Sequence, residues 1–183
     1  METRSKRCLE IFKSIYNLQG DVIELGCHSG CTTIPLARFI KEHNLNKKLY
    51  AYDSFEGLPY AGGELNADLK KGECFCTFET FNENIINNSL QNIIIPVKGI
   101  IEQTLKLNIK NFCFAWFDMD LYESTSFGYK LLENKIVQGG IIGFHDYGFH
   151  RCPGIKKVVD EEVDKKQFKI YSLKDTCVFL KRV

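Results

Sequence analysis

The chain has 183 residues, of which 44% are hydrophobic and 26% are charged, and its formal net charge is +1. Such a length and composition are typical of one globular domain with a full hydrophobic core. The balanced charge gives no reason to expect nucleic acid as a partner, and no apolar run approaches the roughly 20 residues of a membrane-spanning helix. The basic first residues have no apolar stretch behind them, so we expect neither a secretory signal nor a membrane partner.

The predicted elements alternate between helices and strands along the chain. Residues 4–18 have helical apolar spacing, and a strand (21–26), a helix (32–43) and a strand (48–52) then form a βαβ unit. Residues 54–78 are irregular, and a loop of that length is usually functional. The remaining elements are, in order, a helix at 78–90, a strand at 93–98 in which Pro96 indicates an irregular or edge position, a short helix at 102–107, a strand at 112–117, a helix at 122–134, a strand at 140–144, a helix at 154–164, and strands at 168–172 and 177–181.

This order predicts an α/β fold with a Rossmann-like, doubly wound and mostly parallel sheet and an antiparallel strand at its C-terminal edge. We expect a single domain over residues 1–183, with an N-terminal helix within residues 1–20 and an active-site loop at 54–78. The eight cysteines form no Cys-x-x-Cys pair, which argues against a zinc ribbon. Without an export signal, reduced thiols and a cytoplasmic protein are expected.

The turn after the first strand is the first candidate for a ligand site. It reads Glu-Leu-Gly-Cys-His-Ser-Gly over residues 24–30, which is not the Gly-x-Gly-x-x-Gly of dinucleotide-binding proteins. A glycine at this turn lets a ligand approach the backbone, and Glu24 could bind an ammonium group. Asp53 ends the second strand, where a carboxylate commonly accepts hydrogen bonds from a ribose. The alternative is structural: Glu24 caps a helix and Asp53 starts a turn.

A second candidate site follows two later strands. The apolar run before Asp118 and Asp120 stops abruptly, and the run before His145 and Asp146 does the same. Because parallel strands end at one edge of a sheet, these side chains are expected to converge there. Oxygen-rich groups suit Mg²⁺ or Mn²⁺, or a proton transfer. In the structural alternative, Asp120 caps the following helix and Asp146 forms a turn.

The sequence resembles the macrocin O-methyltransferase family of S-adenosylmethionine (SAM)-dependent methyltransferases. The specific strings are Asp-Ser-Phe-Glu-Gly-Leu-Pro at 53–59 and Asp-Met-Asp-Leu-Tyr-Glu-Ser-Thr at 118–125. Residues 24–30, 98–105 and 139–148 also agree, in the same order along the chain. The family's enzymes methylate hydroxyl groups, typically on sugars of macrolides, aminocoumarins and related metabolites. The resemblance therefore implies a class I SAM-dependent O-methyltransferase acting on a small hydroxylated acceptor, a sugar or a glycosylated metabolite.

The resemblance also implies roles for individual residues. The SAM-binding residues would be Glu24, Gly26 and Ser29 at the methionine end, and Asp53 with Ser54 at the ribose. Asp118 and Asp146 would ligate a Mg²⁺ ion, with His145 as a third metal-site residue. Asp120 would be the general base that takes the proton from the acceptor hydroxyl.

The chain departs from the family pattern in two places. The family usually has two adjacent aspartates where this chain has His145 and Asp146, and a histidine is a softer ligand that supplies no negative charge. A weaker site, a different metal and no metal at all stay open. Family members also carry more sequence before the first strand. The acceptor site is accordingly open, completed by a second copy in a homo-oligomer, or built from residues 57–78.

Two other hypotheses were weighed against the methyltransferase. A nucleotide-dependent oxidoreductase would use the same sheet, but its glycine fingerprint is missing. A non-catalytic SAM-binding protein is compatible with His145. Such a protein has no need of the three aspartates at 118, 120 and 146 beside the methyl group.

Overall fold

The computed structural model describes residues 4–60, 63–106 and 110–183. Seven strands form one sheet in the order β3-β2-β1-β4-β5-β7-β6. Strands β1 to β5 run parallel, and β7 pairs antiparallel with both β5 and β6. The predicted mostly parallel sheet with an antiparallel C-terminal edge is therefore confirmed. The strands are β1 (Asp21–Leu25), β2 (Leu49–Asp53), β3 (Ile94–Lys98), β4 (Phe112–Phe117), β5 (Ile136–Phe144), β6 (Phe168–Lys174) and β7 (Cys177–Arg182).

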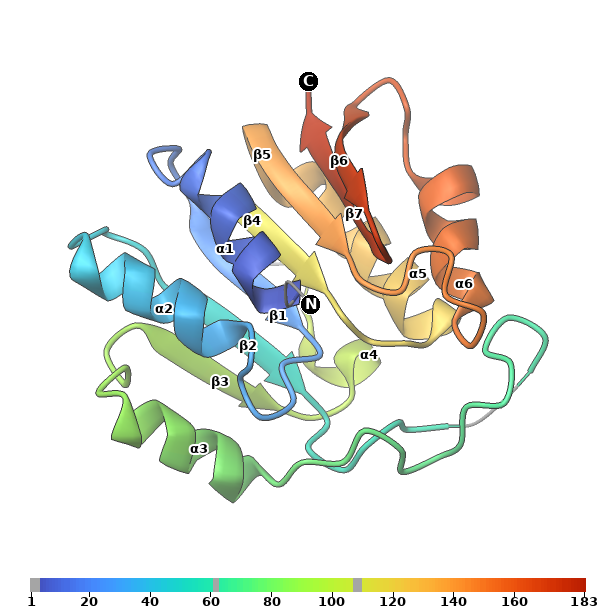
Figure 1. The fold of residues 1–183 in the computed structure, drawn as a ribbon, viewed down its shortest axis with the longest axis horizontal. Coiled ribbons are helices and arrows are strands. Elements are labelled where there is room, and N and C mark those ends of the chain that lie inside the picture. Colours follow the sequence, from blue (N-terminus) through green and yellow to red (C-terminus); the bar gives the residue numbers. More distant parts are fainter. Residues whose placement is uncertain (1–3, 61–62, 107–109) are drawn as a thin grey trace.

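Helices cover both faces of the sheet (Figure 1). Phe12, Leu36 and Phe81, from the first three helices, pack in one buried cluster on one face, and Ile101, Tyr129 and Ile155, from the last three, pack in a second cluster on the other. The result is a three-layer α/β/α fold. The helices are α1 (Arg4–Lys13), α2 (Thr33–Glu42), α3 (Phe78–Asn87), α4 (Ile101–Thr104), α5 (Tyr122–Leu132) and α6 (Pro153–Lys157), with a 3₁₀ turn η1 (Glu133–Lys135) and a π-helical turn η2 (Val158–Glu162).

Strand β4 lies at the centre of the sheet, between β1 and β5. All six of its residues are buried, because helices cover both of its faces. Phe114 packs in the cluster beneath α1 and α2, and Phe117 packs in the cluster beneath α5. Each buried phenylalanine contributes about 1.5–3 kcal/mol of hydrophobic stabilisation. This rigid centre fixes the position of the polar residues that follow β4.

Several element boundaries differ from the predicted ones. Strand β5 begins at Ile136 rather than at Gly140, because Gly139 adopts a φ of +77° and the pairing with β4 shifts register around it. The predicted helix at 154–164 is divided into α6 and η2. Helix α4 ends at Thr104, and residue 107, the predicted end, lies outside the described residues. Strand β3, which contains Pro96, is at the sheet edge as predicted.

Over the three described stretches, no helix combines the length and the apolar character needed to cross a membrane. All eight cysteines carry free thiols.

Candidate active site

The carboxyl ends of β1, β2, β4 and β5 open into a cleft of about 350 Å³. Ligands of open parallel sheets bind at this edge, and the volume lies in the range of small-molecule sites. The predicted site residues on its wall are Gly26, Asp53, Ser54, Asp118, Asp120, His145 and Asp146. The structure therefore brings most of both candidate clusters into one cavity.

Gly26 sets the close approach between the ends of β1 and β4. Its φ is +86°, and a Cβ atom built on it would lie 2.0 Å from the backbone oxygen of Asp118. A side chain at this position would collide with the backbone, so the turn needs glycine for both its conformation and its space. The turn leads directly into the cleft beside the end of β2.

Asp53 is held rigidly at the end of β2. Its Oδ2 accepts a hydrogen bond from the backbone N–H of His28, and its Oδ1 accepts one from the backbone N–H of Phe55, both at 2.8 Å. The neighbouring Ser54 donates its hydroxyl to the Gly57 carbonyl at 2.7 Å. Each carboxylate oxygen of Asp53 keeps a second lone pair. Asp53 is thus an oriented acceptor for a pair of hydroxyl groups.

Glu24 and Ser29 are placed differently from the other predicted ligands. Glu24 is 1% exposed, and its Oε2 accepts a hydrogen bond of 2.6 Å from the Thr33 hydroxyl, in the first turn of α2. Burial raises the pKa of Glu24 to about 8, although the Thr33 bond opposes this. The Ser29 hydroxyl lies 3.2 Å from the His28 imidazole. His28 itself lines the cleft, a position that the sequence analysis had not assigned to it.

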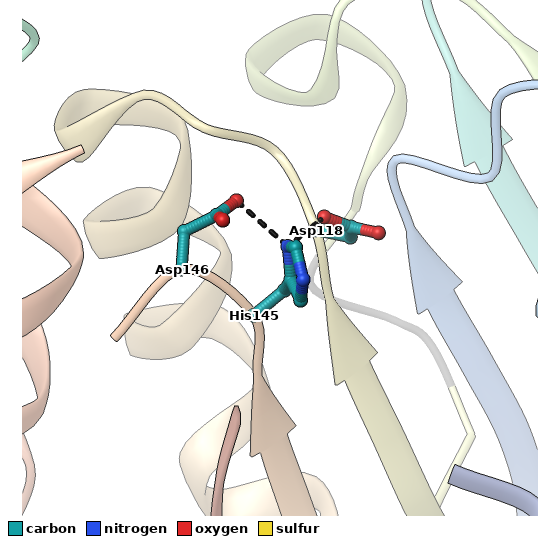
Figure 2. A group of neighbouring side chains, drawn as sticks. All are labelled: Asp118, His145 and Asp146. Carbon is teal, nitrogen blue, oxygen red and sulfur yellow. Dashed lines mark ion pairs between the residues drawn. The ribbon is translucent and has the colours of Figure 1, made fainter. Parts of the chain in front are cut away.

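The second cluster joins the ends of β4 and β5 (Figure 2). The imidazole Nδ1 of His145 lies 3.0 Å from Asp118 Oδ1 and 2.8 Å from Asp146 Oδ2. The imidazole therefore lies between the two carboxylates, each close enough to its Nδ1 for a short polar contact. Burial opposes protonation of His145, but hydrogen bonding and charge from the two aspartates outweigh it and raise the pKa to about 9. The imidazole is therefore positively charged at neutral pH.

Asp120 lies next to this cluster in a strained conformation. Its φ is +60° and that of Asp146 is +59°, and such backbone strain in non-glycine residues is often found at functional sites. Burial, together with a hydrogen bond to Asp146 and the charges of Asp118 and Asp146, raises the pKa of Asp120 to about 7. The Cys74 thiol donates a hydrogen bond of 3.4 Å to Asp120 Oδ2. A carboxylate with a pKa near the working pH suits a general base.

The capping alternative for Asp120 is wrong. Helix α5 has Leu121 at its N-cap, and Asn66 from the long loop accepts the hydrogen bond from the Tyr122 N–H at 2.8 Å. Asp146 does begin a turn, because its carbonyl accepts a hydrogen bond from the Phe149 N–H. Its side chain nevertheless points to the cluster (Figure 2).

Besides His28, sequence reasoning missed three polar residues of the cleft. Arg4, at the start of α1, places its Nη1 3.3 Å from Asp118 Oδ2. Cys74 comes from the long loop, and Arg151, after β5, binds that loop through Asp68 and Glu73 at 2.9 Å each. Local spacing carries no signal for Arg4, because the contact spans more than a hundred residues. The 118–125 string identified Asp118 but not Arg4, its partner in this ion pair.

The donor atoms of this cluster differ from those that Mg²⁺ prefers. Asp118, His145 and Asp146 offer ligand atoms within 4.8 Å of one another, and Asp120, Asp146 and Cys152 form a second such group. Mg²⁺ demands nearly octahedral oxygen ligands at about 2.0–2.1 Å. Here an imidazole nitrogen stands between two carboxylates and a guanidinium takes the free oxygen of Asp118. This arrangement is a poor fit for Mg²⁺, and the metal role of the three residues stays a prediction.

Three solved structures with a similar fold are described as methyltransferases. The O-methyltransferase NovP is 25% identical, with a TM-score of 0.84 over 97% of this chain and 77% of NovP. The calicheamicin methyltransferase CalS11 is 16% identical, with a TM-score of 0.75 over 98% of this chain and 80% of CalS11. TomG from Streptomyces achromogenes, solved with SAM, is 11% identical, with a TM-score of 0.68 over 98% and 79% of the two chains. A search of curated proteins gives no match.

The sheet order, the glycine turn after β1 and the aspartate after β2 define a class I SAM-dependent methyltransferase. The macrocin-O-methyltransferase (TylF) family model matches residues 4–182, nearly the whole chain. The chain belongs to this family and is a SAM-dependent O-methyltransferase. This decides between the three hypotheses drawn from the sequence, in favour of the methyltransferase.

Proposed function

We propose that this enzyme transfers the methyl group of SAM to a hydroxyl group of a sugar or of a glycosylated metabolite. The family name and the likeness to NovP support a hydroxyl acceptor. CalS11 is described as a TDP-rhamnose 3'-O-methyltransferase, which supports a sugar as the acceptor. A small molecule is also what a cleft of about 350 Å³ accommodates.

In this proposal SAM binds along the ends of β1 and β2. Asp53 accepts hydrogen bonds from the ribose diol, since two backbone N–H groups already fix its carboxylate. Ser54 lies beside it, and Gly26 lets the methionine part approach the backbone. Glu24 supports the turn from behind through Thr33, and Ser29 lies beside His28. Glu24 is buried with a raised pKa, which makes it a neutral hydrogen-bonding group at neutral pH rather than a counter-ion for the SAM ammonium.

Asp120 is the proposed general base, and its place on the cleft wall beside Asp146 is the observation that carries the proposal. A pKa raised to about 7 is consistent with this role. The acceptor oxygen attacks the methyl carbon of the sulfonium, so the O–CH₃ bond forms as the S–CH₃ bond breaks. The hydroxyl proton passes to Asp120 and S-adenosylhomocysteine leaves. The sulfonium is already activated, so the protein aligns the oxygen and removes its proton.

The long loop supplies the proposed acceptor side of the cleft. Leu58 and Leu69 from this loop, together with Phe149 after β5, give an apolar wall. Arg151 holds the loop in place through Asp68 and Glu73. Such a wall suits the apolar face of a sugar or an aglycone and excludes water from the methyl transfer.

The test is an incubation of the protein with SAM and a panel of nucleotide sugars and glycosylated phenols. Release of S-adenosylhomocysteine together with a methylated product would support the proposal. Lack of SAM binding would refute the cofactor site, and methylation of an amine in place of a hydroxyl would refute the acceptor class.

The compartment and the assembly also belong to this proposal. Eight free thiols suit a reducing compartment, so we place the enzyme in the cytoplasm. A homo-oligomer that completes the acceptor site stays a prediction, and sedimentation velocity would test it.

A further inference from the structure

Both oxygens of Asp118 are already paired with basic side chains of the protein. Oδ1 lies 3.0 Å from His145 Nδ1, and Oδ2 lies 3.3 Å from Arg4 Nη1. The Asp118 side chain is only 8% exposed, so these pairs are poorly screened by solvent. Two separate elements, the end of β5 and the start of α1, deliver the basic groups to the end of β4.

His145 also connects the two outer carboxylates. The same Nδ1 that contacts Asp118 lies 2.8 Å from Asp146 Oδ2, and Figure 2 shows the ring between the two side chains. A divalent cation would bind these two carboxylates in the same way, by lying between them. With the imidazole nitrogen there, the place of the ion is taken by a group of the chain itself.

We propose that His145 and Arg4 replace the divalent cation, and that this enzyme works without one. The imidazole and the guanidinium hold Asp118 and Asp146 in position through these short contacts, while Asp120 stays available for the acceptor proton. This inference rests on the proposed function of the same cleft, since it states how that cleft is organised.

The arrangement gives α1 a role in the site. Arg4 is the first described residue of the chain, and its guanidinium lines the cleft. A guanidinium can donate several hydrogen bonds at once, so Arg4 can hold Asp118 and still face the cleft. An ion bound at this cluster would compete with Arg4 for Asp118 Oδ2.

The experiment is a titration with Mn²⁺, followed by calorimetry and by the loss of the free-ion electron paramagnetic resonance signal. Three proteins are compared: wild type, His145→Asp, and a control His43→Asp. His43 is exposed at the end of α2, so the control adds the same carboxylate away from the cleft. The readout needs no methyl transfer, so it can fail separately from the proposed function, which SAM binding tests.

We expect no Mn²⁺ binding by wild type or by the control at millimolar ion. His145→Asp should bind Mn²⁺ with a Kd at least tenfold below the highest ion concentration at which wild type shows no binding. Wild-type turnover should be unchanged by a chelator. Micromolar binding of Mn²⁺ by wild type would overturn the inference. So would a folded His145→Asp protein, shown by circular dichroism and SAM binding, that gains no affinity for the ion.

A second variant tests the part of Arg4. Arg4→Gln in the His145→Asp background should strengthen Mn²⁺ binding further, because it frees Asp118 Oδ2. Equal affinity in the single and double variants would show that Arg4 does not take part in excluding the ion, and would refute its share of the inference.

Discussion

Replacing Asp120 with asparagine removes the proposed base and keeps the size of the side chain. General base catalysis contributes about 10²–10⁴-fold to a rate, so kcat should fall by that factor, which is about 3–5 kcal/mol in the barrier. The affinity for SAM should be nearly unchanged, because the proposed SAM contacts are at β1 and β2. Single-turnover methylation and calorimetry with SAM measure the two quantities.

The pH dependence sharpens this prediction. Burial and the neighbouring aspartates raise the pKa of Asp120 to about 7, and only the deprotonated form can accept a proton. About a tenth of the enzyme is then active at pH 6 and about nine-tenths at pH 8, so kcat should rise roughly tenfold across this range. The Asp120→Asn variant should lack this rise.

A matched control is Asp175→Asn, in the turn between β6 and β7, where the aspartate side chain is 70% exposed. It should keep the wild-type kcat and the wild-type pH profile. An Asp120→Asn enzyme with most of its kcat, or with the same rise between pH 6 and pH 8, would refute the assignment of the base.

Three further changes test other parts of the structure. Gly26→Ala should lower the free energy of unfolding, measured in urea, by about 2–4 kcal/mol, since its Cβ would lie 2.0 Å from a backbone oxygen. The control Gly72→Ala has a similar φ but open space around it, and should lower it by about 1 kcal/mol. Arg151→Ala should speed proteolysis of residues 63–77 several-fold and raise the acceptor KM, because the loop loses its two ion pairs with Arg151. The control Lys157→Ala, which removes a similarly exposed basic side chain, should change neither. Burial raises the pKa of Glu24 in the folded chain to about 8, well above its ordinary value of 4.5. The protonated Glu24 therefore stabilises the fold fully at low pH, and this contribution is lost as the pH rises towards 8. Relative to Glu24→Gln, wild-type stability should therefore fall by about 1.4 kcal/mol per pH unit between about pH 5.5 and 7.5, and equal pH slopes for the two proteins would contradict this.

Much of the fold followed from local patterns. The continuous apolar run at 112–117 and the strand–turn–helix at 21–43 predict a buried parallel sheet, because a strand covered on both faces needs apolar residues throughout. The boundaries that failed depend on tertiary pairing. Gly139 and Gly140 indicate a turn in isolation, yet β5 includes them as a bulge because Ile136, which precedes them, already pairs with Phe112 of β4.

The candidate site was predictable where it follows strand ends. Asp53, Asp118 and His145 each come directly after an apolar strand, so their convergence required only a parallel sheet. Arg4 was not predictable, because its contact depends on where α1 docks. Nor does sequence reveal that Glu24 is buried behind the turn, since its exposure depends on the packing of α2 against β1.

Arg4, the first described residue, and the C-terminal end of β7 lie at opposite ends of the sheet. Arg4 reaches the cleft, whereas Arg182, at the end of β7, donates to the carbonyls of Glu133 and Ile136 at the start of β5, far from it (Figure 1). An affinity tag or a fusion partner placed before residue 4 would therefore stand at the mouth of the catalytic cleft. One placed after residue 183 would leave the mouth clear, so reagents for binding and turnover measurements should carry their tags at the C-terminus.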